Sequence, residues 1–188
     1  MAVGASWGGL DALRIVLSGL PADLDAALVV AQHRSSGSHP TALRTLLGAA
    51  CGLTVCDADD KQPIRRGYVF LAPASYHLLV EGTHLALSVE EPVAFSRPSI
   101  DVMFESAAES YRERCAGVVL TGANDDGARG LARIRQLGGA AVVQDPDTAE
   151  RSEMPRAALA AVPDAEVASL PQIGRLLVDL CGTTKAAA

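Results

Sequence analysis

Three side chains with the chemistry of an acyl-transfer site each follow an apolar stretch of the chain: Ser6, His33 and Asp126. A serine hydroxyl is a weak nucleophile until a neighbouring base removes its proton, and neutral imidazole can do so near neutral pH. A carboxylate beside the imidazole orients it and stabilises its cation. The residue types are therefore those of a nucleophile, a general base and an orienting carboxylate.

Each of these residues also has an ordinary structural interpretation. The hydroxyl of Ser6 could cap a helix that opens at Gly8, and Asp126 could cap a helix that begins at Ala128. For these two residues taken alone, capping is the commoner role. His33 could be the polar end of an apolar strand, so the catalytic hypothesis depends on all three residues lying together.

The surrounding elements decide whether they can meet. Apolar strand-like runs occupy 27–32, 68–72, 116–122 and 140–144, and helical patterns lie near 8–19, 40–50, 98–113, 127–137, 154–161 and 171–181. This alternation predicts an α/β fold: a three-layer α/β/α sandwich around a doubly wound, mostly parallel, Rossmann-like sheet. Ligands of such sheets bind outside the carboxyl ends of the strands, where the three residues are expected.

One stretch departs from the alternation. Residues 76–90, "YHLLVEGTHLALSVE", hold two strand-like runs joined at 81–83, which predicts a β-hairpin and suggests that the sheet is mixed. Residues 183–188 lack an apolar face and are predicted to be a disordered tail after a domain spanning 1–182. After Met1, only Ala2 and Val3 precede Gly4, whereas a central strand usually has about five residues, so we expect a trimmed strand or a natural start upstream.

Composition limits the classes of function. The chain has 188 residues, 49% hydrophobic and 20% charged, which predicts one soluble globular domain. Its net charge of −6 and the lack of a basic, aromatic stripe argue against nucleic acid as a ligand. No apolar run approaches the roughly 20 residues of a membrane span, and no signal-peptide pattern is seen, so we expect no membrane insertion and a cytoplasmic location.

The remaining metal-binding residue types do not form a metal motif. No CxxC pair and no zinc-finger spacing is present, so no metal is expected and the cysteines are predicted to be buried free thiols. We expect the other histidines to have surface or structural roles. These residues are Cys51, Cys56, Cys115, Cys181, His39, His77 and His84.

The segment "GASWGG" at 4–9 could be a phosphate-binding loop or a nucleophile elbow. A dinucleotide loop needs a glycine where Ser6 stands and an acidic residue where the second strand ends at Gln32-His33. The segment matches GxSxG better. However, the α/β-hydrolase order is Ser, Asp, His after several strands, whereas here the order is Ser, His, Asp from the first strand, which indicates a different fold with similar geometry.

Six motifs from Val3 to Leu180 resemble the catalytic domain of the chemotaxis protein-glutamate methylesterases, the CheB family. They are "GASWGG" (4–9), "VVAQH" (29–33), "FLAP" (70–73), "RPSIDVMFESAA" (97–108), "VVLTGANDDGARGL" (118–131) and "MPRAAL" (154–159). The resemblance implies a hydrolase of γ-glutamyl methyl esters on methyl-accepting chemotaxis receptors, with glutamine deamidation as a second activity and no cofactor.

The resemblance also implies roles for particular residues. Ser6 is then the nucleophile, His33 the general base and later general acid, and Asp126, rather than Asp125, the orienting carboxylate. The backbone N–H groups of Trp7 and Ala123 are expected to form the oxyanion hole.

The chain also departs from the family pattern. The family usually has a small residue where Trp7 stands and often methionine where Ala123 stands, so substrate preference could differ. Arg97 and Met154 could line the cleft or be structural. No receiver domain is expected, which leaves two alternatives open: a regulatory CheB-like binding module with little turnover, and a related hydrolase acting outside chemotaxis.

Overall fold

Seven parallel strands form the central sheet of the computed structural model, which describes residues 1–33 and 41–184. The strand order is β3-β4-β2-β1-β7-β8-β9. The strands are β1 (Ala2–Ala5), β2 (Leu28–Gln32), β3 (Thr54–Asp57), β4 (Tyr68–Leu71), β7 (Ala116–Val119), β8 (Ala140–Gln144) and β9 (Glu166–Ala168). Because β2, β1 and β7 are neighbours, the loops after them leave the sheet side by side.

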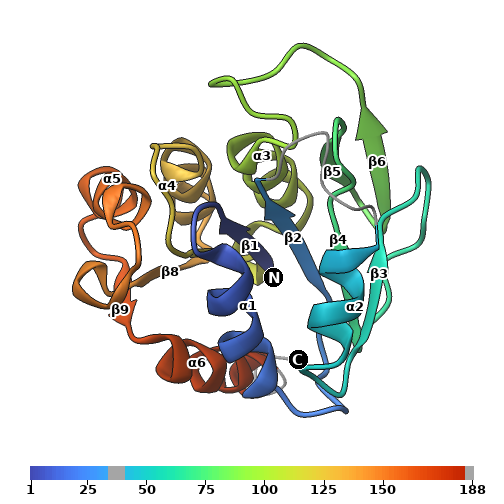
Figure 1. Cartoon of the computed structure of the whole chain (residues 1–188), viewed down its shortest axis with the longest axis horizontal. Coiled ribbons are helices and arrows are strands. Elements are labelled where there is room, and N and C mark those ends of the chain that lie inside the picture. Colours follow the sequence, from blue (N-terminus) through green and yellow to red (C-terminus); the bar gives the residue numbers. More distant parts are fainter. Residues whose placement is uncertain (34–40, 185–188) are drawn as a thin grey trace.

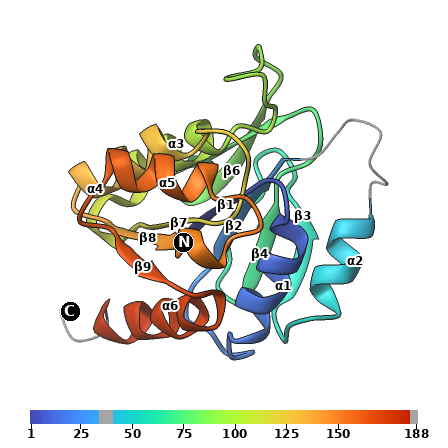
Figure 2. The same cartoon turned by 60° about the vertical axis from the view of Figure 1, so that its left-hand side comes forward.

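Helices cover both faces of this sheet, as Figures 1 and 2 show. One face packs against α1 (Gly9–Ser18), α2 (Ala42–Gly48) and α6 (Leu170–Thr184), and the other against α3 (Ile100–Tyr111), α4 (Ala128–Gln136) and α5 (Glu153–Ala161). Two short 3-10 helices, Arg112–Arg114 and Pro146–Thr148, complete the helical elements. Alternate strand residues point to opposite faces of the sheet and belong to two hydrophobic cores. Val3 and Val30 face α1, whereas Ala2 and Val29 face α3. The predicted three-layer sandwich is confirmed.

The hairpin is present, but the expectation of a mixed sheet was wrong. Strands β5 (His77–Glu81) and β6 (His84–Ser88) form a separate antiparallel sheet. The hairpin packs on α3, where the hydroxyl of Ser106 accepts a hydrogen bond from Val80 N (3.0 Å) and that of Ser110 donates to Val80 O (2.8 Å). Helix side chains therefore satisfy the edge of β5 that another strand would otherwise pair with.

The structure also differs from the sequence predictions in short segments whose hydrophobic pattern is weak. The edge strands β3 and β9 were not predicted, because β3 is mostly half-buried and β9 has only three residues, two of them exposed. Helix α6 includes Thr183 and Thr184, which were assigned to the tail, and 185–188 lie outside the described residues. All four cysteines are free, but only Cys115 is buried. No helix in the described part of the chain is long and apolar enough to cross a membrane.

Candidate active site

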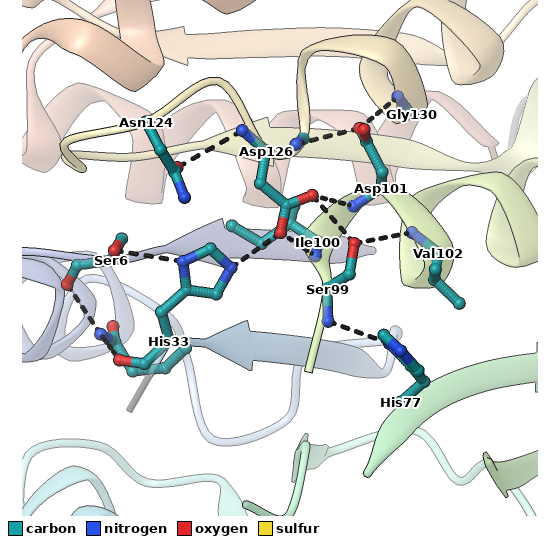
Figure 3. A network of polar contacts seen from close by, with 12 residues as sticks. Ser6, His33, His77, Ser99, Ile100, Asp101, Val102, Asn124, Asp126 and Gly130 are labelled. Atoms are coloured by element: carbon teal, nitrogen blue, oxygen red, sulfur yellow. Dashed lines mark hydrogen bonds and ion pairs between the residues drawn. The ribbon is translucent and has the colours of Figure 1, made fainter. Parts of the chain in front are cut away.

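Ser6, His33 and Asp126 lie in one hydrogen-bonded row at the carboxyl ends of β1, β2 and β7 (Figure 3). Nδ1 of His33 is 3.2 Å from Ser6 Oγ, and Nε2 is 2.7 Å from Asp126 Oδ2. An ionised carboxylate only accepts, so it selects the tautomer with hydrogen on Nε2. Nδ1 then has a lone pair directed at the serine hydroxyl, as a general base requires.

The capping alternatives are not what the structure contains. Gly8 is the N-cap of α1 and Gly127 that of α4, and a glycine has no side chain with which to cap its own helix. The turn after β1 is made possible by Gly8, whose φ of 75° is in the left-handed region. Ser6 has no positive φ, so this turn lacks the strained serine that defines the α/β-hydrolase elbow.

Gln32, the residue before His33, links the segments that follow β1 and β2. Its buried amide donates from Nε2 to the carbonyl oxygens of Ser6 (2.7 Å) and His33 (3.0 Å). Ser6 is further held by its own N–H, which donates to Thr121 O at 2.9 Å. The sequence analysis did not identify Gln32, although the residue lies in the quoted motif "VVAQH".

The carboxylate of Asp126 is completely buried and accepts four hydrogen bonds. Oδ1 accepts from Ser99 Oγ and Asp101 N, both at 2.9 Å, and Oδ2 accepts from Ile100 N at 2.8 Å and from His33. Burial by itself raises the pKa of Asp126, but the bonds from His33 and the backbone amides outweigh it and hold the pKa below its ordinary value. Asp126 thus stays ionised beside the imidazole.

Asp126 caps α3, and a second buried carboxylate, Asp101 of α3, caps α4 in return. Asp101 Oδ1 accepts from the backbone N–H groups of Gly127 (2.9 Å) and Gly130 (2.7 Å). Burial raises the pKa of Asp101, and the neighbouring charge of Asp126 adds to this effect despite the opposing bond from Gly130. The position of Asp101 in the first turn of a helix was readable in the sequence, but its partner helix was not.

The backbone N–H groups of Trp7 and Ala123, expected to bind an oxyanion, donate no hydrogen bond to any described residue. The carbonyl of Trp7 is fixed, because it accepts from Thr121 Oγ1 at 3.0 Å. Both residues are exposed.

The indole of Trp7 is held by the loop after β8. Its Nε1 donates to Glu150 Oε1 at 2.7 Å, and the guanidinium carbon of Arg151 stands 5.4 Å from the ring centroid. Glu150 and Arg151 were not identified from the sequence. This contact orients an aromatic side chain beside Ser6.

Met154 and Arg97, the two residues considered as cleft lining, both make contacts within the protein. Met154 is buried, and its sulfur packs against Gly122, where any side chain would collide with it. Arg97 donates from Nη1 to the carbonyls of Val89 and Glu90, both at 2.8 Å, and so braces the loop before α3.

The other histidines were predicted to have surface or structural roles, and no metal site was expected. His77 is buried and accepts from Ser99 N on Nδ1 at 3.2 Å, which links the hairpin to the site. His84 is exposed on the hairpin, and His39 lies outside the described residues. Among the residues that the structure describes, no cluster of His, Cys, Asp or Glu could hold a metal ion.

Known proteins share both this fold and this sequence pattern. A family model described as CheB methylesterase matches residues 1–177. The chain belongs to the CheB methylesterase family. The crystal structure of the Thermotoga maritima CheB methylesterase catalytic domain superposes with a TM-score of 0.90 at 28% identity, covering 95% of this chain and 96% of that one.

CheB relatives differ in how much of their length this chain matches. A protein of Leptospira interrogans is 44% identical over 179 residues, which are 95% of this chain and 92% of the relative. The protein-glutamate methylesterase/protein-glutamine glutaminase of Symbiobacterium thermophilum is 39% identical over 155 residues, 82% of this chain but 42% of that protein. The chain thus corresponds to a part of the longer relative.

Proposed function

We propose that this CheB family member is a protein-glutamate methylesterase in which Ser6 is the nucleophile, His33 the general base and Asp126 the orienting carboxylate. The observation that carries the proposal is the unbroken path of hydrogen bonds from Ser6 Oγ through the imidazole of His33 to a buried, ionised Asp126. The substrate is a methyl-esterified glutamate of a chemoreceptor, and residues 1–182 form the catalytic domain.

In the first half of the reaction, Ser6 Oγ attacks the ester carbonyl carbon while its proton moves to His33 Nδ1. The carbonyl oxygen becomes an oxyanion, which the N–H groups of Trp7 and Ala123 stabilise. Asp126 accepts the Nε2–H bond and stabilises the imidazolium. When the tetrahedral intermediate collapses, the bond to the methoxy oxygen breaks and His33 gives it the proton, releasing methanol and leaving an acyl-serine.

In the second half, water attacks the acyl-serine and gives a proton to His33 Nδ1. Collapse of the second tetrahedral intermediate breaks the bond to Ser6 Oγ, which takes the proton back, and glutamate is released. A glutamine side chain would follow the same route with ammonia in place of methanol. The names of the relatives, which include protein-glutamine glutaminase, support this second activity.

The test is methanol release from a methylated chemoreceptor by the wild type, Ser6→Ala and Ser18→Ala. Ser18 lies at the far end of α1, where its hydroxyl donates to Ile15 O, so its variant is a matched control. We expect Ser6→Ala to lose at least about 10³-fold in rate and Ser18→Ala to keep the wild-type rate. Equal rates for the wild type and Ser6→Ala, or no methanol from the wild type, would overturn the proposal.

A further inference from the structure

Several exposed apolar side chains lie on loops that adjoin residues of the candidate site in the sequence. Seven large hydrophobic residues are exposed in the described part of the chain, and four of them lie on loops at the carboxyl edge of the sheet. Trp7 follows β1, Tyr76 precedes β5, and Val89 and Phe95 lie between β6 and α3. We call these four residues the apolar rim. Large apolar side chains exposed beside a site are typical of a surface that contacts another molecule.

The loop 89–98 carries the most exposed member of the apolar rim. In Figures 1 and 2 this loop, between β6 and α3, projects from the side of the molecule where β1 and β2 end. Phe95 at its tip is fully exposed, with 104% relative accessibility. A phenyl ring gains nothing for folding in this position, because burial is the source of hydrophobic stabilisation.

The tip is also held in an unfavourable backbone conformation. Val93 and Ser96 exchange two backbone hydrogen bonds of 3.1 and 2.9 Å, which closes a tight turn over two residues. Those residues, Ala94 and Phe95, have φ angles of 48° and 62°, where Asn or Gly is the usual choice. Strain of this kind collects at functional positions.

The base of the loop is rigid and continuous with the active site. Arg97 bonds the carbonyls of Val89 and Glu90, and His77 bonds Glu91 O at 3.1 Å through Nε2. The same imidazole accepts from Ser99 N, and Ser99 Oγ donates to Asp126. The tip is therefore presented at a fixed place relative to the catalytic carboxylate.

We propose that the loop 89–98 is a docking element for the protein substrate, with Phe95 entering an apolar recess of the receptor surface beside the methylated glutamate. This inference rests on the proposed function and names the loop that would bind the receptor substrate. A substrate protein is the favoured occupant because the loop is continuous with the site that must receive its ester. Glu90 and Glu91 at the loop base disfavour an anionic membrane surface.

The experiment compares Phe95→Ser and Phe95→Leu with Ile15→Ser, a matched control at an exposed apolar position of α1. For each, kcat and KM for methanol release from methylated receptor are measured, together with the rate constant for labelling of Ser6 by a small fluorophosphonate. The small probe reports on the nucleophile without needing a protein contact. Sedimentation of the free proteins reports on self-association.

We expect Phe95→Ser to lower the ratio of kcat/KM on receptor to the labelling rate constant by about tenfold or more, mainly through KM. Phe95→Leu should recover part of the loss, and Ile15→Ser should match the wild type. A ratio for Phe95→Ser within twofold of wild type overturns the inference while leaving the methylesterase proposal intact. Self-association that requires Phe95 also overturns it, and absence of methanol release by wild type removes the function on which it rests.

Discussion

Two buried carboxylates cap each other's neighbouring helix: Asp126, just before α4, accepts from the first turn of α3, and Asp101 of α3 accepts from the first turn of α4. The pKa values of the two carboxyl groups are nevertheless shifted in opposite directions. Asp126 accepts four hydrogen bonds and its pKa is lowered. Asp101 accepts two short backbone bonds, with Arg129 Nε 3.6 Å away, and burial raises its pKa. Two carboxylates with the same capping role thus have pKa shifts of opposite sign. Asp126 is the catalytic candidate because it contacts His33, whereas Asp101 bonds only the backbone of α4 and lies near Arg129.

The largest effect is expected from Asp126→Asn, which removes the charge of the carboxylate that contacts His33. The amide oxygen can still accept from the α3 backbone, but an NH₂ group facing His33 selects the wrong tautomer. We expect kcat for methanol release to fall by about 10³–10⁴-fold with the fold retained. Circular dichroism checks the fold, and activity within tenfold of wild type would remove Asp126 from the mechanism.

Gln32→Leu tests the uncharged side chain that holds His33 and Ser6 in place through their backbone carbonyls. The change removes the donor shared by the carbonyls of Ser6 and His33, so the distance between nucleophile and base is no longer fixed. We expect kcat to fall about tenfold with KM little changed, because only the alignment of reacting groups is affected. A variant that changed KM alone would place Gln32 in substrate binding instead.

Asp101→Asn is the matched counterpart of Asp126→Asn and should have a small effect. Its amide oxygen can still accept from Gly127 and Gly130, and no histidine depends on its charge. We expect kcat within about threefold of wild type, whereas Asp101→Ala should lower the free energy of unfolding by about 1–3 kcal/mol because two amides lose their acceptor. Urea denaturation measures the second effect. A loss of activity in Asp101→Asn as large as in Asp126→Asn would end the distinction.

The pH dependence of stability should separate the two residues by sign. The folded state lowers the pKa of Asp126, so its stabilising contribution is present above the ordinary aspartate pKa of about 3.9 and is lost as the pH falls through the lowered value. For Asp101 the folded pKa is raised, so ionisation costs stability above about pH 3.9, and the cost is relieved as the pH falls through the raised value.

Melting temperatures between pH 7 and pH 3 check both signs. On acidification, wild type should gain stability relative to Asp101→Asn, and below about pH 4 it should lose stability relative to Asp126→Asn. Parallel curves for the two variants would contradict the assigned directions.

The sequence predicted the fold and the meeting of Ser6, His33 and Asp126 for one physical reason. Unbroken apolar strands alternating with helices form parallel sheets, and the ends of such strands share an edge. The order of the strands in the sheet was not needed for this prediction, because the serine and the histidine directly follow their strands and the aspartate lies in the loop between β7 and α4.

The supporting residues could not be predicted in the same way. Gln32, Ser99 and Asp101 act through contacts between elements far apart in the sequence, and any polar residue at a helix start or strand end has the same local pattern. The hairpin was predicted at the right residues, but the expectation of a mixed sheet was wrong for a similar reason. The serines of α3 that bond Val80 of β5 are recognisable only once the helix lies against the strand.

The most direct test of the catalytic row is the rate of covalent labelling by a fluorophosphonate, with the modified peptide identified by mass spectrometry. We expect wild type and Asp101→Asn to be labelled on Ser6 at similar rates, whereas His33→Ala and Asp126→Asn should react at least about 100-fold more slowly. Labelling at another residue, or equal rates for Asp126→Asn and Asp101→Asn, would contradict this expectation.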